Sequence, residues 1–224
     1  MKVKVCNKVK TYALLLVFAM GLLFAKTENV YAAKEVASGQ CGDTAYWSLD
    51  DAGVMTISGS GRMWDVRSNG DEDEHERSWE AYINDIKSVV FETGITNVGD
   101  GAFADCKNLK NVSFCNTITG IDYLAFAYCS SLGNFTLPDS LTYLRQQAFW
   151  NCTSITSVAI PDMVAFIDAS VFDGCTSLKY AYIGGSTEAG GYVTGNCIFR
   201  NCTSLEKIEV SEDNLGLESI DGVL

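Results

Sequence analysis

The chain has 224 residues, with 28 Asp or Glu against 16 Lys or Arg and a formal net charge of −12. So acidic a chain is a poor candidate for binding nucleic acid, which needs clustered Lys and Arg, and it is repelled by an anionic membrane surface. Its length is sufficient to bury a sizeable hydrophobic core.

The first 32 residues have the pattern of an export signal. Four lysines precede the apolar run Tyr12–Ala25, which is short for a membrane span, and Val30-Tyr31-Ala32 places small residues for cleavage after Ala32. An uncleaved N-terminal anchor is the alternative. No second apolar run of spanning length follows, so we expect no membrane insertion after cleavage and a secreted or cell-surface location. Cleavage would leave 11 Lys or Arg against 27 Asp or Glu, which makes the chain still more acidic.

Residues 33–85 are expected to form an N-terminal cap. Tyr46–Leu49 and Val54–Ile57 are short β-prone runs, and the turn signal Asp50–Gly53 between them predicts a β-hairpin. A terminal coil of a repeat protein otherwise exposes its apolar face, so the hairpin would cover that face.

An acidic loop, Asn69–Arg77, lies in the same region. Its carboxylates, Asp71–Glu74, have the hard oxygen atoms that calcium prefers, but their spacing differs from that of an EF-hand loop. Solvated carboxylates are therefore the simpler interpretation, and we expect no metal site. His75 is the only histidine. We interpret it as a surface residue, since no serine or cysteine nucleophile is paired with it.

A 23-residue period organises the chain from Ile95 onward. Phenylalanine and cysteine recur at this spacing, and the last copy follows after 27 residues, which indicates an insertion in or near Thr187–Gly195. The recurring residues are Phe103, Phe126, Phe149, Phe172 and Phe199, with Cys106, Cys129, Cys152, Cys175 and Cys202. A fixed period of this length is the signature of a solenoid, so residues 86–224 are expected to form about six coils.

The five recurring cysteines are expected to lie in one row. In stacked coils their side chains would be about 4.8 Å apart and parallel, which is poor geometry for a disulfide. We therefore interpret them as small buried side chains of the core, and one row also makes a poor tetrahedral metal site. Cys41, Cys115 and Cys197 lie off the row, and their state is left open.

Each repeat is expected to contain one strand of a parallel sheet. In Leu109–Phe114, for example, Leu109, Val112 and Phe114 point inward and the residues between them point to solvent. The predicted strands are Ile86–Phe91, Leu109–Phe114, Leu132–Leu137, Ile155–Ile160, Leu178–Ile183 and Leu205–Val210.

The outward side chains of these strands are the predicted ligand face. Tyr180 and Tyr182 stand out, because tyrosine is enriched at the energetic centres of protein interfaces. Covering the sheet edge is their alternative role. Polar candidates on the same face are Lys110, Asn111, Asn134 and Lys179.

The repeat resembles the BspA-like, or Treponema pallidum-type, leucine-rich repeats of bacterial surface proteins. Ala148–Pro161, AFWNCTSITSVAIP, carries the resemblance best, and tandem copies extend it over about residues 86–224. The resemblance implies a β-rich α/β solenoid, wound as a right-handed superhelix, that binds host, matrix or other cell-surface proteins. It implies no catalytic residue and no cofactor.

We therefore expect a non-enzymatic binding protein that mediates adhesion at the cell surface. An accessory or spacer module of a larger exported cell-wall or glycan-degrading enzyme is the alternative. Glu218–Leu224 looks like the start of a further coil, which suggests a fragment of a longer protein or a partner on that end. The ligand, the mode of anchoring and the oligomeric state are left open.

Overall fold

The computed structural model describes residues 33–66, 75–185 and 197–214. The predicted export signal, the carboxylates Asp71–Glu74, the insertion Thr187–Gly195 and the segment Glu218–Leu224 lie outside these ranges. Within the described ranges, no helix has the length and hydropathy needed to cross a membrane.

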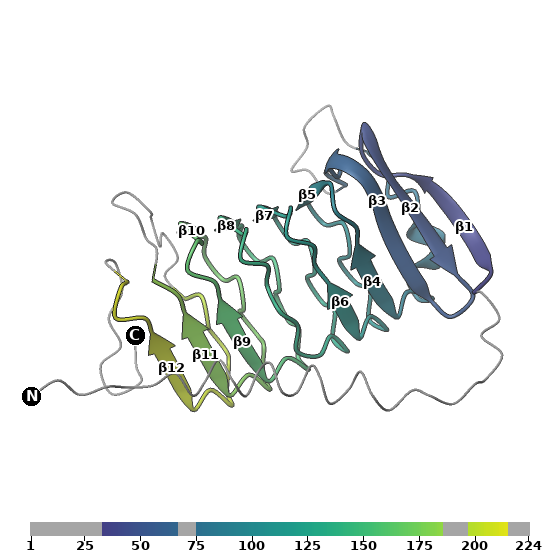
Figure 1. Cartoon of the computed structure of the whole chain (residues 1–224). Coiled ribbons are helices and arrows are strands. Elements are labelled where there is room, and N and C mark those ends of the chain that lie inside the picture. Colours follow the sequence, from purple (N-terminus) through teal and green to yellow (C-terminus); the bar gives the residue numbers. More distant parts are fainter. Residues whose placement is uncertain (1–32, 67–74, 186–196, 215–224) are drawn as a thin grey trace, which may run out of the picture. The chain divides into compact units, whose positions relative to one another are not determined.

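The N-terminal part is an antiparallel sheet of three strands, β1 (Glu35–Gln40), β2 (Thr44–Asp50) and β3 (Val54–Arg62) (Figure 1). The predicted hairpin is present as β2 and β3, with longer strands than expected, while β1 was not predicted. Asp50 closes the turn, because its Oδ1 accepts hydrogen bonds from the backbone N–H groups of Ala52 and Val54.

Strand β3 begins both sheets of the solenoid. Its first half pairs in parallel with β4 (Ser88–Phe91), and its last residues pair in parallel with β5 (Ile95–Val98). Two rows of strands continue from there along the stack of coils (Figure 1). We call the first the strand face: β4, β6 (Asn111–Ser113), β9 (Ser157–Ile160), β11 (Tyr180–Ile183) and β12 (Lys207–Val210). The second row is β5, β7 (Gly120–Ile121), β8 (Tyr143–Leu144) and β10 (Phe166–Ile167).

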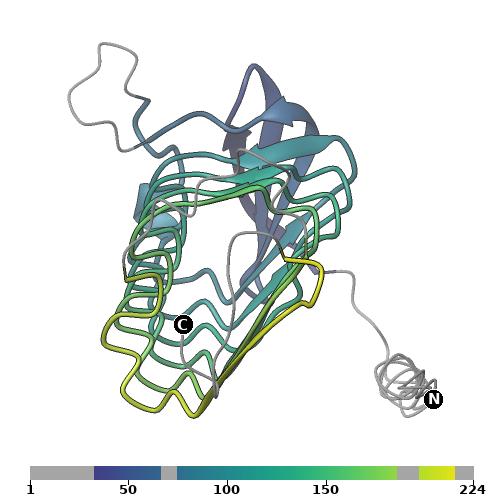
Figure 2. The same cartoon turned by 90° about the vertical axis from the view of Figure 1, so that its left-hand side faces the viewer.

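The return segments between strands are turns, so the expected α/β class is corrected to a β-solenoid. The described residues contain only one helical segment, the short 3-10 helix η1 (Glu80–Tyr82). The physical reason is that each coil has two left-handed residues four positions apart, which an α-helix cannot accommodate. These residues are Gly101, Leu124, Gln147, Ser170 and Cys197, and Asp105, Tyr128, Asn151, Gly174 and Asn201. The coils overlie one another in Figure 2; the winding direction stays a prediction.

The recurring phenylalanines form a column of stacked rings in the core. Neighbouring ring centroids are 5.3 Å apart from Phe103 through Phe126 and Phe149 to Phe172, and these four side chains are fully buried. Phe199 continues the column at 5.7 Å. At the other end the buried Trp79 packs on Phe103 and donates a hydrogen bond from its indole N–H to the carbonyl of Ala102.

The recurring cysteines are unpaired and lie beside the phenylalanines. The Sγ–H group of Cys129, Cys152, Cys175 and Cys202 donates to the backbone carbonyl of the phenylalanine one coil earlier, at 3.1–3.3 Å. The thiols therefore satisfy buried carbonyls as well as filling space, which the sequence did not indicate.

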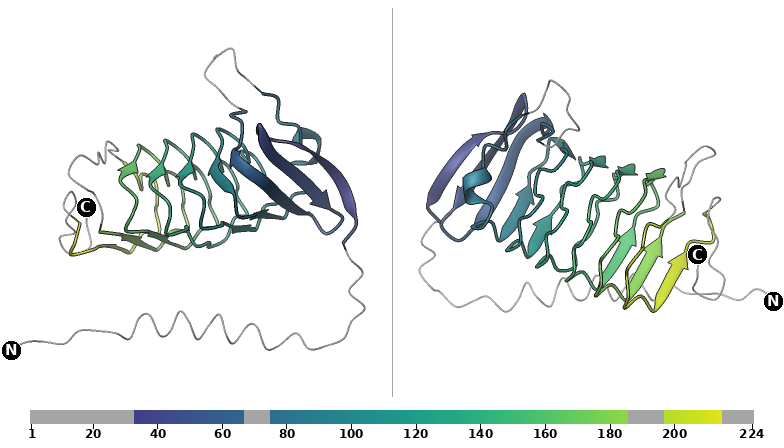
Figure 3. Two further views of the ribbon diagram at one scale, coloured as in Figure 1. Left: turned by 45° about the horizontal axis from the view of Figure 1, so that its top comes forward. Right: turned by 180° about the vertical axis from the view of Figure 1, so that it is seen from behind.

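One predicted strand is absent. Residues Leu132–Leu137 have no strand assignment, and the strand face is divided there into two sheets. Figure 3 shows this plain segment between the teal strands of the first coils and the green strands β9 and β11. In this segment the side chain of Asn134, described below, accepts backbone N–H groups of the following coil.

Substitution of Gly174 tests the left-handed corner. Gly174 has φ of 76°, and an added Cβ would also press against the side-chain oxygen of Asn151. We therefore expect Gly174→Ala to lower the free energy of unfolding by about 1–2 kcal/mol. Gly133→Ala is the matched control, because Gly133 lacks a positive φ and an added Cβ meets only the Lys110 carbonyl oxygen at 3.5 Å. Urea denaturation measures both. Equal losses in the two variants would contradict the assignment of strain to Gly174.

Candidate functional site

The six predicted ligand residues all lie along the strand face, but they do not form one cluster. Lys179, Tyr180 and Tyr182 lie at and beside β11, where Tyr180 is paired in register with Ser157 of β9 and Lys207 of β12. Lys110 and Asn111 lie at β6, and Asn134 lies in the unassigned segment between β6 and β9. A ligand that touches all six must therefore extend across several coils.

The two tyrosines of β11 are half-buried, and Tyr180 has a partner. Its hydroxyl donates a hydrogen bond to Oε2 of Glu209 on β12. Burial, together with Glu209, raises the pKa of Tyr180 to about 12. The Lys207 ammonium and the Tyr180 hydroxyl in turn lower the pKa of Glu209. The Tyr180 ring is thus held in one orientation by the neighbouring strand.

Asn134 has a structural role that the sequence prediction did not include. Its Oδ1 accepts hydrogen bonds from the backbone N–H groups of Thr156 at 2.8 Å and Ser157 at 3.1 Å, and its Nδ2 donates to Oγ1 of Thr156. Asn111, one coil earlier, makes only a 3.4 Å contact from Nδ2 to Oγ of Ser88. Of these two candidates, Asn111 has more of its hydrogen-bonding capacity left for a ligand.

These two asparagines make a matched pair for a stability test. Asn134→Ala removes the acceptor of two backbone N–H groups, so we expect the free energy of unfolding to fall by about 1–2 kcal/mol. Asn111→Ala should change it by less than about 0.5 kcal/mol. Chemical denaturation measures both, and Asn134→Asp should restore part of the loss because it keeps an acceptor. If Asn134→Ala leaves the free energy of unfolding unchanged, the backbone N–H groups find other partners without this side chain.

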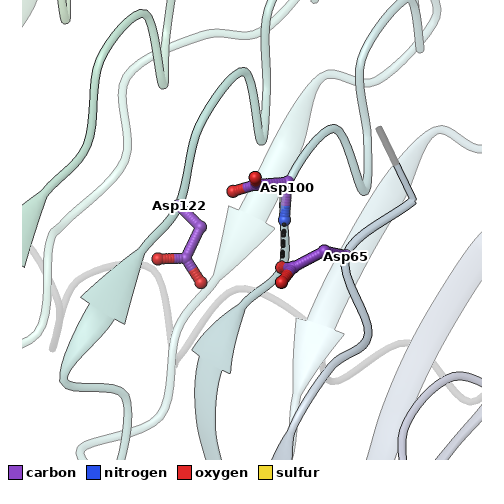
Figure 4. Close-up of side chains that lie close together, drawn as sticks. All are labelled: Asp65, Asp100 and Asp122. Carbon is purple, nitrogen blue, oxygen red and sulfur yellow. Dashed lines mark hydrogen bonds between the residues drawn. The ribbon is translucent and has the colours of Figure 1, made fainter. Parts of the chain in front are cut away.

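A second group of polar residues lies at the carboxyl ends of neighbouring strands. Asp65, Asp100 and Asp122 follow β3, β5 and β7 respectively, so the parallel register brings them to one edge (Figure 4). One carboxylate oxygen of each lies within 4.8 Å of the others. We call these three residues the carboxylate cluster.

Backbone bonds fix the cluster. The N–H of Asp100 donates to Oδ1 of Asp65 at 2.9 Å, and the N–H of Tyr123 donates to Oδ1 of Asp100 at 2.8 Å. The Nδ2 of Asn97 donates to Oδ2 of Asp122 at 2.6 Å. These bonds orient the carboxylates before any ligand arrives.

The charge of the cluster is only partly compensated. Arg62 lies 3.1 Å from Oδ2 of Asp65 and 3.6 Å from Oδ2 of Asp122, but its side chain is 62% exposed. Burial and the nearby Asp65 raise the pKa of Asp100 to about 6, and burial raises the pKa of Asp122. Three carboxylates thus share one solvent-exposed guanidinium.

The sequence contains a partial signal for this cluster. With a period of 23, Asp122 falls one coil after Gly99 and so beside Asp100. Asp65 precedes the repeats, and only the pairing of β3 with β5 brings it to the other two. In the sequence the more visible candidate for a metal site is Asp71–Glu74, where four acidic residues are adjacent.

The raised pKa of Asp100 predicts a pH dependence of stability. The folded protein holds this proton up to about pH 6, whereas the ordinary pKa is 3.8, so the folded state binds more protons in that window. Stability should therefore fall as pH rises from about 4 to 6. In metal-free buffer Asp100→Asn should make this slope shallower, and the exposed Asp139→Asn should not. The midpoint of urea denaturation, measured at several pH values between about 4 and 6, gives this slope. Equal slopes in wild type and Asp100→Asn would contradict the assignment of the pH dependence to Asp100.

Comparison with solved structures supports the same architecture. The chain is similar to a leucine-rich repeat protein of Eubacterium ventriosum, with 24% identity and a TM-score of 0.52 over 67% of this chain and 45% of that one. It is also similar to the T. pallidum leucine-rich repeat protein, with 19% identity and a TM-score of 0.50 over 77% and 86%. These identities support the fold alone, and the chain spans less than half of the E. ventriosum protein.

Comparison at the level of sequence gives the family. No curated protein sequence matches the chain. A family profile described as "BspA type Leucine rich repeat region" matches residues 81–206 in six copies. This match covers more than half of the chain and confirms the resemblance of the repeats, so the protein belongs to the BspA-type leucine-rich repeat family.

Proposed function

We propose that this protein is a non-enzymatic, exported binding protein that holds a protein ligand on its strand face at the bacterial surface. Three observations support the proposal: the family, the signal-like N-terminus and the extended row of outward side chains. The region 33–85 would act as the cap of the first coil, because β3 pairs with strands of both rows and β2 covers its other side.

The charge of the strand face favours a ligand whose own surface is acidic. The outward strand positions include Lys87, Lys110, Lys179 and Lys207 against Glu206 and Glu209. Lys179 is paired with Glu206 and Lys207 with Glu209, so the positive excess of this face lies at Lys87 and Lys110. The whole chain has a net charge of −12. An acidic partner would be repelled by most of the molecule and attracted here, which orients its approach.

The tyrosines of β11 supply the contact area. Both rings are half-buried, and the bond from Tyr180 to Glu209 fixes one of them before binding. A rigid aromatic ring loses little conformational entropy on binding, and tyrosine is enriched among the residues that dominate binding energy. These two half-buried aromatic rings, one of them held in place by Glu209, are the observation that carries the proposal.

The recurring cysteines are suited to the core rather than to nucleophilic catalysis. Burial raises the pKa of Cys106 to about 12 and of Cys202 to about 11, and it raises those of Cys129, Cys152 and Cys175 as well. The thiolate is the nucleophilic form, so these cysteines are poor nucleophiles at neutral pH.

A module of a larger exported protein is the second candidate. The observation that favours it is length, because the chain spans 45% of the E. ventriosum protein and 46% of a leucine-rich repeat protein of Bacteroides ovatus that it resembles. In that role the same strand face would bind or space a neighbouring domain.

Removal of the two tyrosines tests the proposed face. Combining Tyr180→Ala with Tyr182→Ala should weaken binding to an extracellular-matrix or cell-surface protein at least tenfold. Tyr46→Ala is the matched control, since Tyr46 is 51% exposed on β2, at the other end of the stack from β11 (Figure 1), and should leave the affinity within twofold.

Surface plasmon resonance over immobilised matrix proteins measures the dissociation constants. Affinity for an acidic partner should also fall as the salt concentration rises. If the double variant binds within twofold of wild type, the ligand does not bind at these tyrosines. If the wild-type protein binds no matrix protein and no cell, the spacer role is favoured.

A further inference from the structure

We propose that Asp65, Asp100 and Asp122, together with Asn97, bind one calcium ion that joins the carboxyl ends of β3, β5 and β7. The inference goes beyond ligand binding on the strand face, because the cluster lies in the other row of strands. It stands on the separation of the oxygens, an unpaired buried oxygen of Asn97 and the excess of negative charge.

The separation of the oxygens fits the size of calcium. Ligand oxygens lie about 2.3–2.6 Å from calcium, so two of them on one ion are at most about 5 Å apart. The three carboxylates each present an oxygen within 4.8 Å of the others, which one calcium ion spans. Magnesium needs oxygens at about 2.0–2.1 Å and hence no more than about 4 Å apart. The cluster as it stands therefore suits calcium better.

Asn97 provides the independent sign of a missing ligand. Its side chain is 4% exposed, and its Oδ1 has no hydrogen-bond partner. Because Nδ2 of the same amide lies 2.6 Å from Oδ2 of Asp122, Oδ1 lies within about 5 Å of that carboxylate by amide geometry. A buried acceptor without a donor is unfavourable, and this oxygen would gain a partner if it turned toward a cation at the cluster.

The amide of Asn97 also explains how the cluster responds to an ion. With the cluster empty, Nδ2 faces Asp122, since a donor is required next to a carboxylate. Rotation of the amide by half a turn exchanges Nδ2 and Oδ1 and presents a carbonyl oxygen, which is a ligand that calcium accepts. Asn97 would thus be a donor to Asp122 without calcium and a ligand with it.

Arg62 occupies the place of the cation in the ion-free protein. Its guanidinium contacts Asp65 and Asp122, yet its side chain is mostly exposed, so it can move into solvent without unfolding any strand. Calcium and Arg62 would compete for the same carboxylates. Removal of Arg62 should therefore tighten calcium binding, an effect that a purely structural ion pair does not predict.

The experiment is calorimetric titration of the purified protein with calcium chloride. We expect a dissociation constant of about 10⁻⁴–10⁻³ M, as in extracellular calcium modules, and weaker binding of magnesium. Asp122→Asn should weaken calcium binding at least tenfold, Arg62→Gln should strengthen it severalfold, and the exposed Asp139→Asn should leave it unchanged. Circular dichroism verifies that each variant is folded.

A second pair of variants keeps the proposal testable if Asp122→Asn does not fold. Asn97→Asp adds a carboxylate at the proposed fourth ligand and should strengthen calcium binding. Joint substitution of Asp71 and Asp73 by Asn removes the alternative acidic ligands and should have no effect. Loss of binding in that loop variant, unchanged binding in Asp122→Asn, or no heat up to 10⁻² M calcium (about tenfold above the expected range) would each overturn the proposal.

Discussion

The structure depends on the fixed distance between coils at the phenylalanine column. Each ring stacks on the next at 5.3 Å through the central coils, and each following thiol donates to the phenylalanine carbonyl of the coil before it. A coil longer or shorter than its neighbour would break both contacts unless the extra residues left the stack. The column therefore enforces the 23-residue period, and through it every outward residue is placed in a row.

The sequence predicted the parts of the fold that repeat in residue type. Phenylalanine and cysteine recur, and the strand face alternates inward and outward residues, so both were visible as a period. The left-handed corners were not visible, because their positions hold glycine, leucine, glutamine, serine, cysteine, aspartate, tyrosine and asparagine. The second row was missed for another reason: β7, β8 and β10 have two residues each, too few to show an alternating pattern.

The candidate ligand residues lie along the strand face, but the contacts that each makes could be seen only in the structure. Asn111 and Asn134 occupy the same repeat position, yet only Asn134 holds the backbone of the next coil. Tyr180 and Tyr182 share a strand, yet the hydroxyl of Tyr180 is held by Glu209. A period fixes where a residue lies, whereas its neighbours in the adjacent coils decide what it does.

The two proposed functional regions are separated along the stack, which limits how one can affect the other. The carboxylate cluster joins β3, β5 and β7 at the N-terminal end, whereas the tyrosines lie on β11, beyond β8 and β10. In a solenoid each coil contacts only its neighbours, so stabilisation at one end decays along the array. An ion at the cluster would thus strengthen the first coils most and reach the tyrosines only through the coils between. The segment Leu132–Leu137, where the strand face is divided into two sheets, lies on that route and would be the weakest step in the coupling.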